Sequence, residues 1–141
     1  MSFDFKVTNG SISFLQGDLA LVTGAEKLNQ EILKIALTPI GGNFFNPAYG
    51  SYFSQSLIGS YLDADISTVI GTNQLKDSLE NLKTLQDMQQ NQYGQQMLPS
   101  ELLAAVQNVS IVQDPSDPRS YFVSIQYISK AFTSGNLSFS L

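Results

Sequence analysis

Residues 18–50 read DLALVTGAEKLNQEILKIALTPIGGNFFNPAYG, and the signals that organise the chain lie in this stretch. It opens with a short apolar run, Leu19 to Val22, that is typical of a strand. Thr23 and Glu26 follow at the spacing of a capping box, in which each side chain bonds the backbone amide of the other. We therefore expect a helix to begin at about Gly24.

This predicted helix has one apolar face. Leu28, Ile32 and Ile35 recur at helical spacing and form a stripe. Three further residues widen the stripe: Leu33, Ala36 and Leu37. The helix should end at Thr38-Pro39, because a residue before proline is pushed out of the helical region.

An aromatic loop comes next, on a segment punctuated by Gly and Pro. Its five rings are Phe44, Phe45, Tyr49, Tyr52 and Phe53. Aromatic side chains bury a large area at low entropy cost and recur at binding hot spots. Phe44, Phe45, Pro47 and Tyr49 are therefore candidate partner-binding residues. The alternative is that the rings fill the core beneath a sheet, with Phe45 and Tyr49 inward if Pro47 makes a turn between them.

The segment before this stretch alternates apolar and polar residues, as half-buried strands do. The apolar members are Phe3, Phe5, Val7, Ile12 and Phe14. Asn9-Gly10 favours a type I′ hairpin turn, and residues 16–18 turn the chain again. The opening is thus a small antiparallel sheet that leads into the helix. No internal repeat is visible.

After the loop, residues 51–58 predict a short helix closed by Gly59, and Asp63 or Asp65 should cap a long helix that reaches about Gln92. The apolar positions of the long helix are Ile66, Val69, Ile70, Leu75, Leu79, Leu82, Leu85 and Met88. The stripe slips near residues 71–72. Residues 98–105 predict a short third helix that begins with proline in its first turn.

The last third of the chain is rich in strand signals. Residues 106–112 and 121–128 alternate, and Ser134-Gly135-Asn136 predicts a hairpin before the terminal strand. Leu137, Phe139 and Leu141 could let that strand join a neighbour's sheet through main-chain bonds. The alternative is that these residues close the chain's own core. We predict one α+β domain, residues 1–141, with an N-terminal hairpin and a C-terminal meander packed on one medium and one long helix.

Composition excludes several function classes. Charged residues make up 13 % of the chain, about half the usual share, and the net charge is −5 with Arg119 as the one arginine. Phosphate contacts need clustered Lys and Arg, so we expect no nucleic-acid binding. The chain contains no His and no Cys, which leaves no ordinary zinc site, and we expect no metal or cofactor. The low charge favours a subunit covered by neighbours, or else a monomer coated with Ser, Asn and Gln.

No signal peptide and no apolar run of about 20 residues is present, so we expect no membrane span, and we expect assembly in a cytoplasm.

Three parts of the sequence resemble the baseplate wedge family of contractile phage tails. They are residues 17–38, the loop positions Gly41, Phe45, Pro47 and Tyr49-Gly50, and the terminal Leu-Ser-Phe-Ser-Leu. Type VI secretion baseplates have a related component. The most specific part of the resemblance is the helix centred on Gln30 with the loop that follows it.

The resemblance implies a structural role in the virion. Such proteins pack against larger wedge subunits and start polymerisation of the tail sheath, joining neighbours by shared β-strands; tail tube or hub proteins are further candidate partners. The family commonly has an acidic residue after the loop glycine and an arginine before the proline. In this chain Gly42 and the uncharged residues 43–46 occupy those positions. A contact with a wedge partner at this loop would therefore have to be made by Phe44, Phe45, Tyr49 and backbone groups.

An old family label, lysozyme-like, raises the alternative of a muramidase. Glycoside hydrolysis needs two carboxylates across a cleft, one of them with a raised pKa. Glu26, Glu31, Glu80 and Glu101 are the candidates, and no pair of them stands out. We therefore expect a non-enzymatic assembly protein. The remaining alternatives are a component of another contractile injection system and a small stand-alone binding module.

Overall fold

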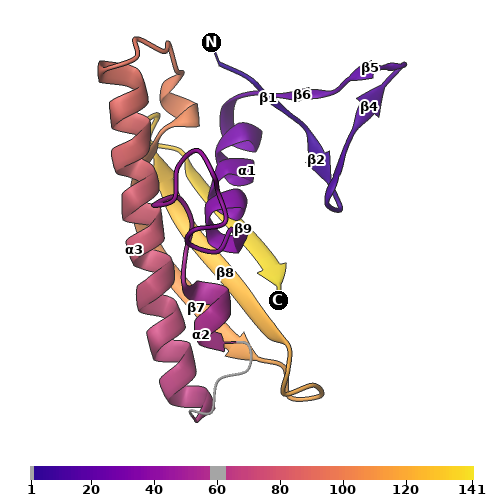
Figure 1. Ribbon diagram of the computed structural model, residues 1–141, viewed down its shortest axis with the longest axis vertical. Helices are drawn as coiled ribbons and strands as arrows, with labels where there is room; N and C mark the ends of the chain where they lie inside the picture. The colour runs from indigo at the N-terminus through magenta and orange to yellow at the C-terminus, as the bar shows by residue number, and fades with distance from the viewer. Residues whose placement is uncertain (1, 58–62) are drawn as a thin grey trace.

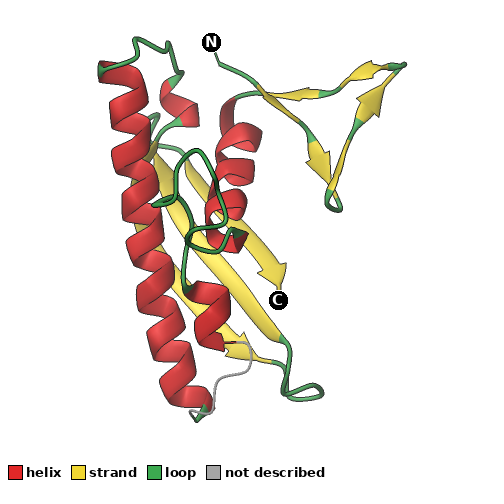
Figure 2. Cartoon of the chain, viewed as in Figure 1, coloured by secondary structure: helices red, strands yellow, loops and turns green. Residues whose placement is uncertain are grey.

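The structure, a computed structural model, describes residues 2–57 and 63–141. Three helices cover one face of a three-stranded antiparallel sheet, and residues 4–22 form an arm of short strands beside this body (Figure 1). The predicted α+β class is confirmed, although the N-terminal hairpins and the C-terminal meander belong to separate sheets (Figure 2).

The helices lie close to their predicted positions. They are α1 (Gly24–Leu37), α2 (Phe53–Leu57), α3 (Ala64–Asn91) and the 3-10 turn η1 (Pro99–Glu101). The helix predicted for residues 98–105 is therefore only a single turn, because β-pairing takes over at Leu103. The predicted closing residue of α2, Gly59, lies outside the described residues.

Apolar side chains from all three helices meet the sheet in one core. Its fully buried members are Leu28, Ile32, Ile35, Ala36, Phe53, Leu75, Leu79 and Ile125. Leu75 and Leu79 are one helical turn apart and cover the sheet, as their spacing predicts. Burial of a Leu or Phe side chain stabilises the fold by about 1.5–3 kcal/mol, so this layer holds the body together.

The first half of α3 departs from its predicted apolar stripe. Ile66 and Val69 are exposed, and the buried face consists of the small residues Ser67 and Gly71. A Cβ on Gly71 would lie 3.2 Å from a methyl of Leu57. The slip in the stripe therefore reflects a close approach of α3 to α2, which large side chains would prevent.

The sheet consists of β7 (Leu103–Gln113), β8 (Tyr121–Ser129) and β9 (Ser134–Ser140), in the order β7-β8-β9. Because β8 is central, β7 and β9 are both edge strands. Side chains from Tyr121 to Tyr127 alternate, with the odd-numbered residues buried against the helices. The even-numbered ones lie on the uncovered face.

The start of α1 is at Gly24 as predicted, but the predicted capping box is wrong. Thr23 makes no side-chain capping bond. The amide of Gly24 instead donates to Oε1 of Glu101 at 3.2 Å. A carboxylate distant in the sequence thus accepts a hydrogen bond from the first turn of α1, where the local Thr23–Glu26 pair was expected to cap the helix.

The arm contains three two-stranded ladders. They pair β1 (Asp4–Phe5) with β6 (Leu21–Val22), β2 (Val7–Thr8) with β3 (Ser11–Ile12), and β4 (Phe14–Leu15) with β5 (Asp18–Leu19). The ladders meet at Lys6, Ser13 and Ala20, whose backbones form a closed ring of hydrogen bonds. Lys6 donates to Ala20, Ala20 to Ser13 and Ser13 to Lys6, at 2.8–2.9 Å.

This three-way junction reveals an internal repeat that the sequence analysis missed. The three ring residues are spaced seven apart, and the segments VTNGSI and FLQGDL occupy equivalent hairpins. Asn9 and Gly10 have φ of 51° and 77°, and Gln16 and Gly17 have φ of 53° and 91°. Both turns therefore have the paired positive φ of type I′ hairpins.

Candidate functional site

Within residues 2–57 and 63–141, the outer edge of β9 presents backbone groups that have no strand partner. Tyr121 and Leu141 exchange both backbone hydrogen bonds, at 3.1 and 2.9 Å, so they are a hydrogen-bonded pair of the antiparallel ladder. Such pairs alternate, and the amides and carbonyls of Asn136, Ser138 and Ser140 therefore point away from β8. These three residues offer donors and acceptors to an incoming strand.

The β9 edge of the sheet lacks the usual protection against edge pairing. Natural edge strands are commonly blocked by charged residues, proline or bulges. β7, β8 and β9 contain no charged residue and no proline. β7 has two register irregularities, between Leu103 and Ala105 and between Val106 and Asn108, whereas β9 pairs with β8 without interruption. β9 is thus the more regular edge for strand addition.

The predicted terminal-strand residues serve the chain's own core. Leu137, Phe139 and Leu141 are partly buried and pack against it. The ring of Phe139 meets that of Phe53 edge-on, with centroids 6.3 Å apart. The side chains therefore close the core while the backbone edge stays open, so the two alternatives for this strand coexist.

The aromatic loop is closed at its base and exposed at its tip. The amide of Ser51 donates to the carbonyl of Thr38 at 2.8 Å. Gly50 sits between them with φ of 127°, and a Cβ there would lie 2.5 Å from that carbonyl oxygen. Only glycine fits this close approach.

Phe44 and Phe45 project from the loop as a pair. Their exposed fractions are 90 % and 94 %, and their rings meet edge-on with centroids 5.6 Å apart. Oδ1 of Asn43 accepts the amides of Phe45 and Asn46, at 3.0 and 3.2 Å, and so fixes the turn. The expectation that Phe45 points inward is wrong, because this turn directs both rings outward.

The other two loop candidates differ from the Phe pair. Pro47 is exposed, and its carbonyl accepts the amide of Gly41 at 3.0 Å. Tyr49 points inward as predicted and packs against the core. Burial, with the negative charges of Glu31 and Asp4, raises the pKa of Tyr49 to about 12.

A pocket of about 320 Å³ beside Tyr49 brings two carboxylates together, Asp4 and Glu31. Glu31 lies 3.1 Å from the ammonium of Lys27, and Asp4 pairs with Lys34. Burial alone would raise the pKa of Asp4, but hydrogen bonds and the charge of Lys34 bring it below its usual value. Asp4 therefore does not resemble the protonated acid that a glycosidase requires.

Glu101 is the centre of a buried polar network that sequence reasoning did not identify. Its Oε2 accepts from the hydroxyl of Ser2 at 2.7 Å and from the amide of Leu98 at 2.9 Å. The hydroxyl of Ser2 also accepts from Lys27 at 2.8 Å. Burial would raise the pKa of the Glu101 carboxyl, but these bonds, that of the Gly24 amide and the Lys27 charge lower it overall.

Gln30 fastens the arm to the body. Its side chain donates to the carbonyl of Phe5 at 2.8 Å and accepts from the amide of Val7 at 2.9 Å. It also donates to Asp4 at 3.1 Å. The two backbone bonds flank Lys6, so Gln30 holds the arm beside its three-way junction. The sequence signals were a glutamine beside the apolar stripe of a helix and the family resemblance centred on it, and neither gave Gln30 a partner.

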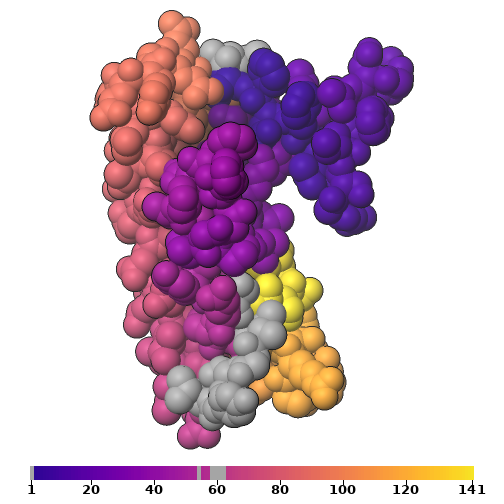
Figure 3. Space-filling model, in the orientation of Figure 1, coloured from indigo at the N-terminus to yellow at the C-terminus, as the bar shows by residue number. Residues whose placement is uncertain are grey.

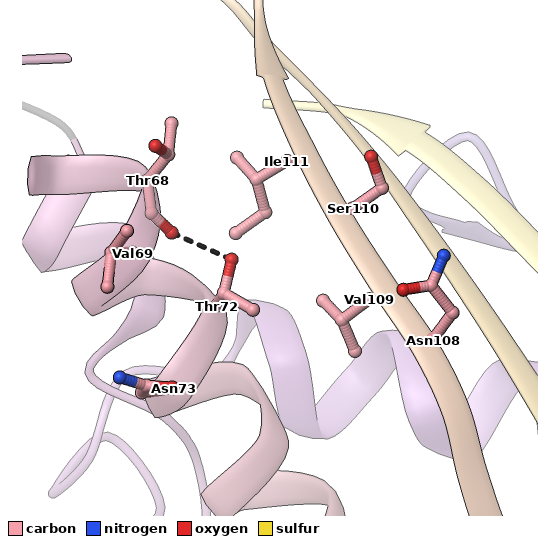
Figure 4. A pocket seen from close by; sticks show the side chains of 8 residues that line it. All are labelled: Thr68, Val69, Thr72, Asn73, Asn108, Val109, Ser110 and Ile111. Carbon is pink, nitrogen blue, oxygen red and sulfur yellow. Dashed lines mark hydrogen bonds between the residues drawn. The ribbon is translucent and has the colours of Figure 1, made fainter. Parts of the chain in front are cut away.

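Two grooves border the sheet edges. One, of about 360 Å³, lies between α3 and β7 and is lined by uncharged residues. Figure 4 shows Thr72 of α3 and Ile111 of β7 facing each other across it. There the hydroxyl of Thr72 donates to the carbonyl of Thr68 at 2.7 Å. The other, of about 670 Å³, lies between α1, the hairpin of β2 and β3, and the end of β9.

Across residues 2–57 and 63–141, no group of three or more acidic residues is placed to hold a metal ion. Within the same ranges, none of the helices has the length and hydropathy needed to cross a bilayer.

No family model and no curated protein sequence matches this chain. Solved structures do: one is the crystal structure of a "putative tail lysozyme" from Geobacter sulfurreducens. It superposes with a TM-score of 0.60, covering 82 % of this chain and 87 % of that chain, at 14 % sequence identity. This chain shares the fold of that protein. At this identity the likeness concerns the fold and not the chemistry.

Proposed function

We propose that this protein is a structural subunit of a contractile phage tail baseplate, which packs in the wedge and starts the tail sheath by sharing a β-strand. The observation that carries the proposal is the open, uncharged and regular edge of β9. The fold shared with a protein described as a "putative tail lysozyme" supports it, as does the family resemblance of residues 17–50. In this proposal the protein resides in the virion.

Phe44 and Phe45 are proposed to contact the larger wedge subunits. Two rings that are almost wholly exposed leave a large apolar area in water, and monomeric proteins rarely group such residues without a partner. Asn43 fixes the turn beneath them, so little conformational entropy is lost when a partner pocket covers the rings. Aromatic anchors of this kind are typical of binding hot spots.

We propose that the protein is not a muramidase. Asp4 and Glu31, the carboxylates that share a pocket, are each neutralised by a lysine. Glu101 is ionised, fully buried and committed to hydrogen bonds. A retaining or inverting glycosidase needs a carboxylic acid that keeps its proton near neutral pH, and the pKa values of Asp4 and Glu101 are shifted the other way.

The proposal is tested by blocking the edge of β9 without disturbing its pairing with β8. Ser138→Pro removes an amide that points outward, and proline is tolerated in edge strands at such positions. Ser138→Ala, which keeps the amide, is the matched control. We expect particles carrying Ser138→Pro to have tails without an extended sheath, and those carrying Ser138→Ala to be normal.

Normal sheaths in the proline particles would contradict strand sharing at β9. The muramidase alternative has its own readout, which is clearing of a peptidoglycan suspension by the purified protein. If clearing occurs and Glu31→Gln abolishes it, the non-enzymatic proposal is overturned.

A further inference from the structure

The arm has one apolar face that the fold itself does not use. Residues paired across an antiparallel ladder point to the same side of it. Val7 pairs with Ile12, Phe14 with Leu19 and Phe5 with Leu21, and the seven-residue repeat makes these pairs equivalent. All six side chains therefore share one face of the arm. Their exposed fractions range from 41 % to 68 %.

The opposite face of the arm is more polar. Thr8 pairs with Ser11, and the hydroxyl of Ser13 donates to that of Thr8 at 2.8 Å. Leu15, paired with Asp18, also lies on this side and is 68 % exposed. The arm is thus an amphipathic plate, and the asymmetry between its faces indicates that the apolar one meets another surface.

The apolar face borders the free edge of β9. Val7 forms one wall of the groove of about 670 Å³, Leu33 and Leu37 of α1 form another, and Phe139 and Ser140 of β9 lie at its end. Figure 3 shows the arm overhanging the last strand across a hollow. A strand added to β9 would therefore run directly beneath the arm.

Hydrogen bonds and an ion pair to α1 fix the arm in this position. Gln30 bonds the backbone on both sides of Lys6, and Asp4 pairs with Lys34. Among the residues that the structure describes, Lys34 is the one charged residue that lines the groove, and this ion pair occupies its ammonium. A charged side chain entering the groove would find no free partner there, and burying an unpaired charge is costly.

We propose that the arm is a clamp which covers the strand that adds to β9, and that the incoming segment is an extended, uncharged peptide with apolar residues at every second position. This inference rests on the proposed strand sharing and adds the chemistry of the partner. The alternate apolar side chains would enter the groove between Leu33, Leu37 and Val7. A volume of about 670 Å³ lies within the range of established ligand pockets, about 300–1,000 Å³, and accommodates several such side chains.

The test uses a fluorescent peptide with the sequence SGNLSFSL, which is residues 134–141 of this chain and has the required pattern. A peptide of the same composition with its three apolar residues adjacent is the control probe. Anisotropy titrations compare the wild-type protein with Val7→Asp and Ile12→Asp on the apolar face, Leu15→Asp on the opposite face, and Ser138→Pro at the β9 edge. Circular dichroism confirms that each variant is folded.

We expect the alternating peptide to bind the wild type and Leu15→Asp equally, and both apolar-face variants at least ten-fold more weakly. Ser138→Pro should also weaken binding. Equal binding by the wild type, Val7→Asp and Ile12→Asp would overturn the clamp while leaving strand sharing intact. Loss of binding in Val7→Asp but not in Ser138→Pro would support the arm as the binding site and contradict strand sharing. No binding to the wild type, or equal binding of both peptides, would overturn the proposed recognition.

Discussion

The arm and the body use apolar residues in opposite ways. In the body, Leu28, Leu79 and Ile125 are fully buried between helices and sheet, whereas in the arm Val7 and Phe14 remain about half exposed or more. Both regions obey the same strand alternation. The difference is that the body has a second layer to cover its apolar face and the arm has none.

This contrast shows what holds each region. The body is stabilised by burial, and the arm by main-chain bonds: the ring through Lys6, Ser13 and Ala20 and the anchor on Gln30. An isolated two-stranded hairpin is marginally stable in water, so three of them need such a junction. We expect the arm to be the less stable region until a partner covers it.

The largest effect is expected at Glu101, where arm and body meet. Glu101→Ala removes the acceptor of Ser2, Gly24 and Leu98, and so leaves one buried and two partly buried donors without their acceptor. We expect the free energy of unfolding to fall by about 3–5 kcal/mol. Urea titration measures this, with the exposed Glu26→Ala as the control, and a loss below about 1 kcal/mol would contradict the central role of Glu101.

The same carboxylate should make the stability depend on pH. The folded-state pKa of Glu101 lies below the ordinary value of 4.5, so its contribution is complete above about pH 4.5 and declines as the pH falls through the folded-state pKa. Glu101→Gln should flatten this part of the stability curve. Parallel curves for wild type and variant between pH 5 and pH 3 would show that other groups control the acid limit.

Gly135, in β9 of the body, pairs with Tyr127 of β8. A Cβ at Gly135 would lie 2.2 Å from the ring of Tyr127, whose hydroxyl donates to Asn29 of α1 at 2.5 Å. Gly135→Ala must displace that ring, at a cost of about 1–3 kcal/mol. Thermal unfolding measures the loss, and a variant as stable as the wild type would refute this packing.

Releasing the arm should cost less. Gln30→Ala removes the bonds to Phe5 and Val7, which are partly exposed to water, so we expect a loss of about 1 kcal/mol. Hydrogen exchange should accelerate at Lys6, Ser13 and Ala20 and stay unchanged in β8. Unchanged protection of these three amides would mean that the backbone junction of Lys6, Ser13 and Ala20 holds the arm in place without Gln30.

The smallest effect on stability is expected at the tip of the aromatic loop. Phe44→Ala with Phe45→Ala should change the free energy of unfolding by no more than about 0.5 kcal/mol, because both rings are exposed. Phe53→Ala, in the buried core, should cost about 3–5 kcal/mol. Under the proposed function the double variant should nevertheless fail to enter particles. Normal incorporation would remove the loop from the interface.

The sequence by itself determined the local elements of this protein. Apolar spacing placed α1 and α3, the Asn9-Gly10 signal placed a hairpin, and alternation identified the inward side of β8, because these patterns depend on neighbours a few residues away. The family resemblance marked Gln30 but gave it no partner.

Only the tertiary structure decided the choices that depend on distant neighbours. Glu101, not Glu26, bonds the amide at the start of α1, because the chain brings η1 beside it. Phe45 points outward because Asn43 fixes the turn. The arm and the edge of β9 lie on either side of one groove for the same reason: segments far apart in the sequence are placed together by packing, which no short-range pattern encodes.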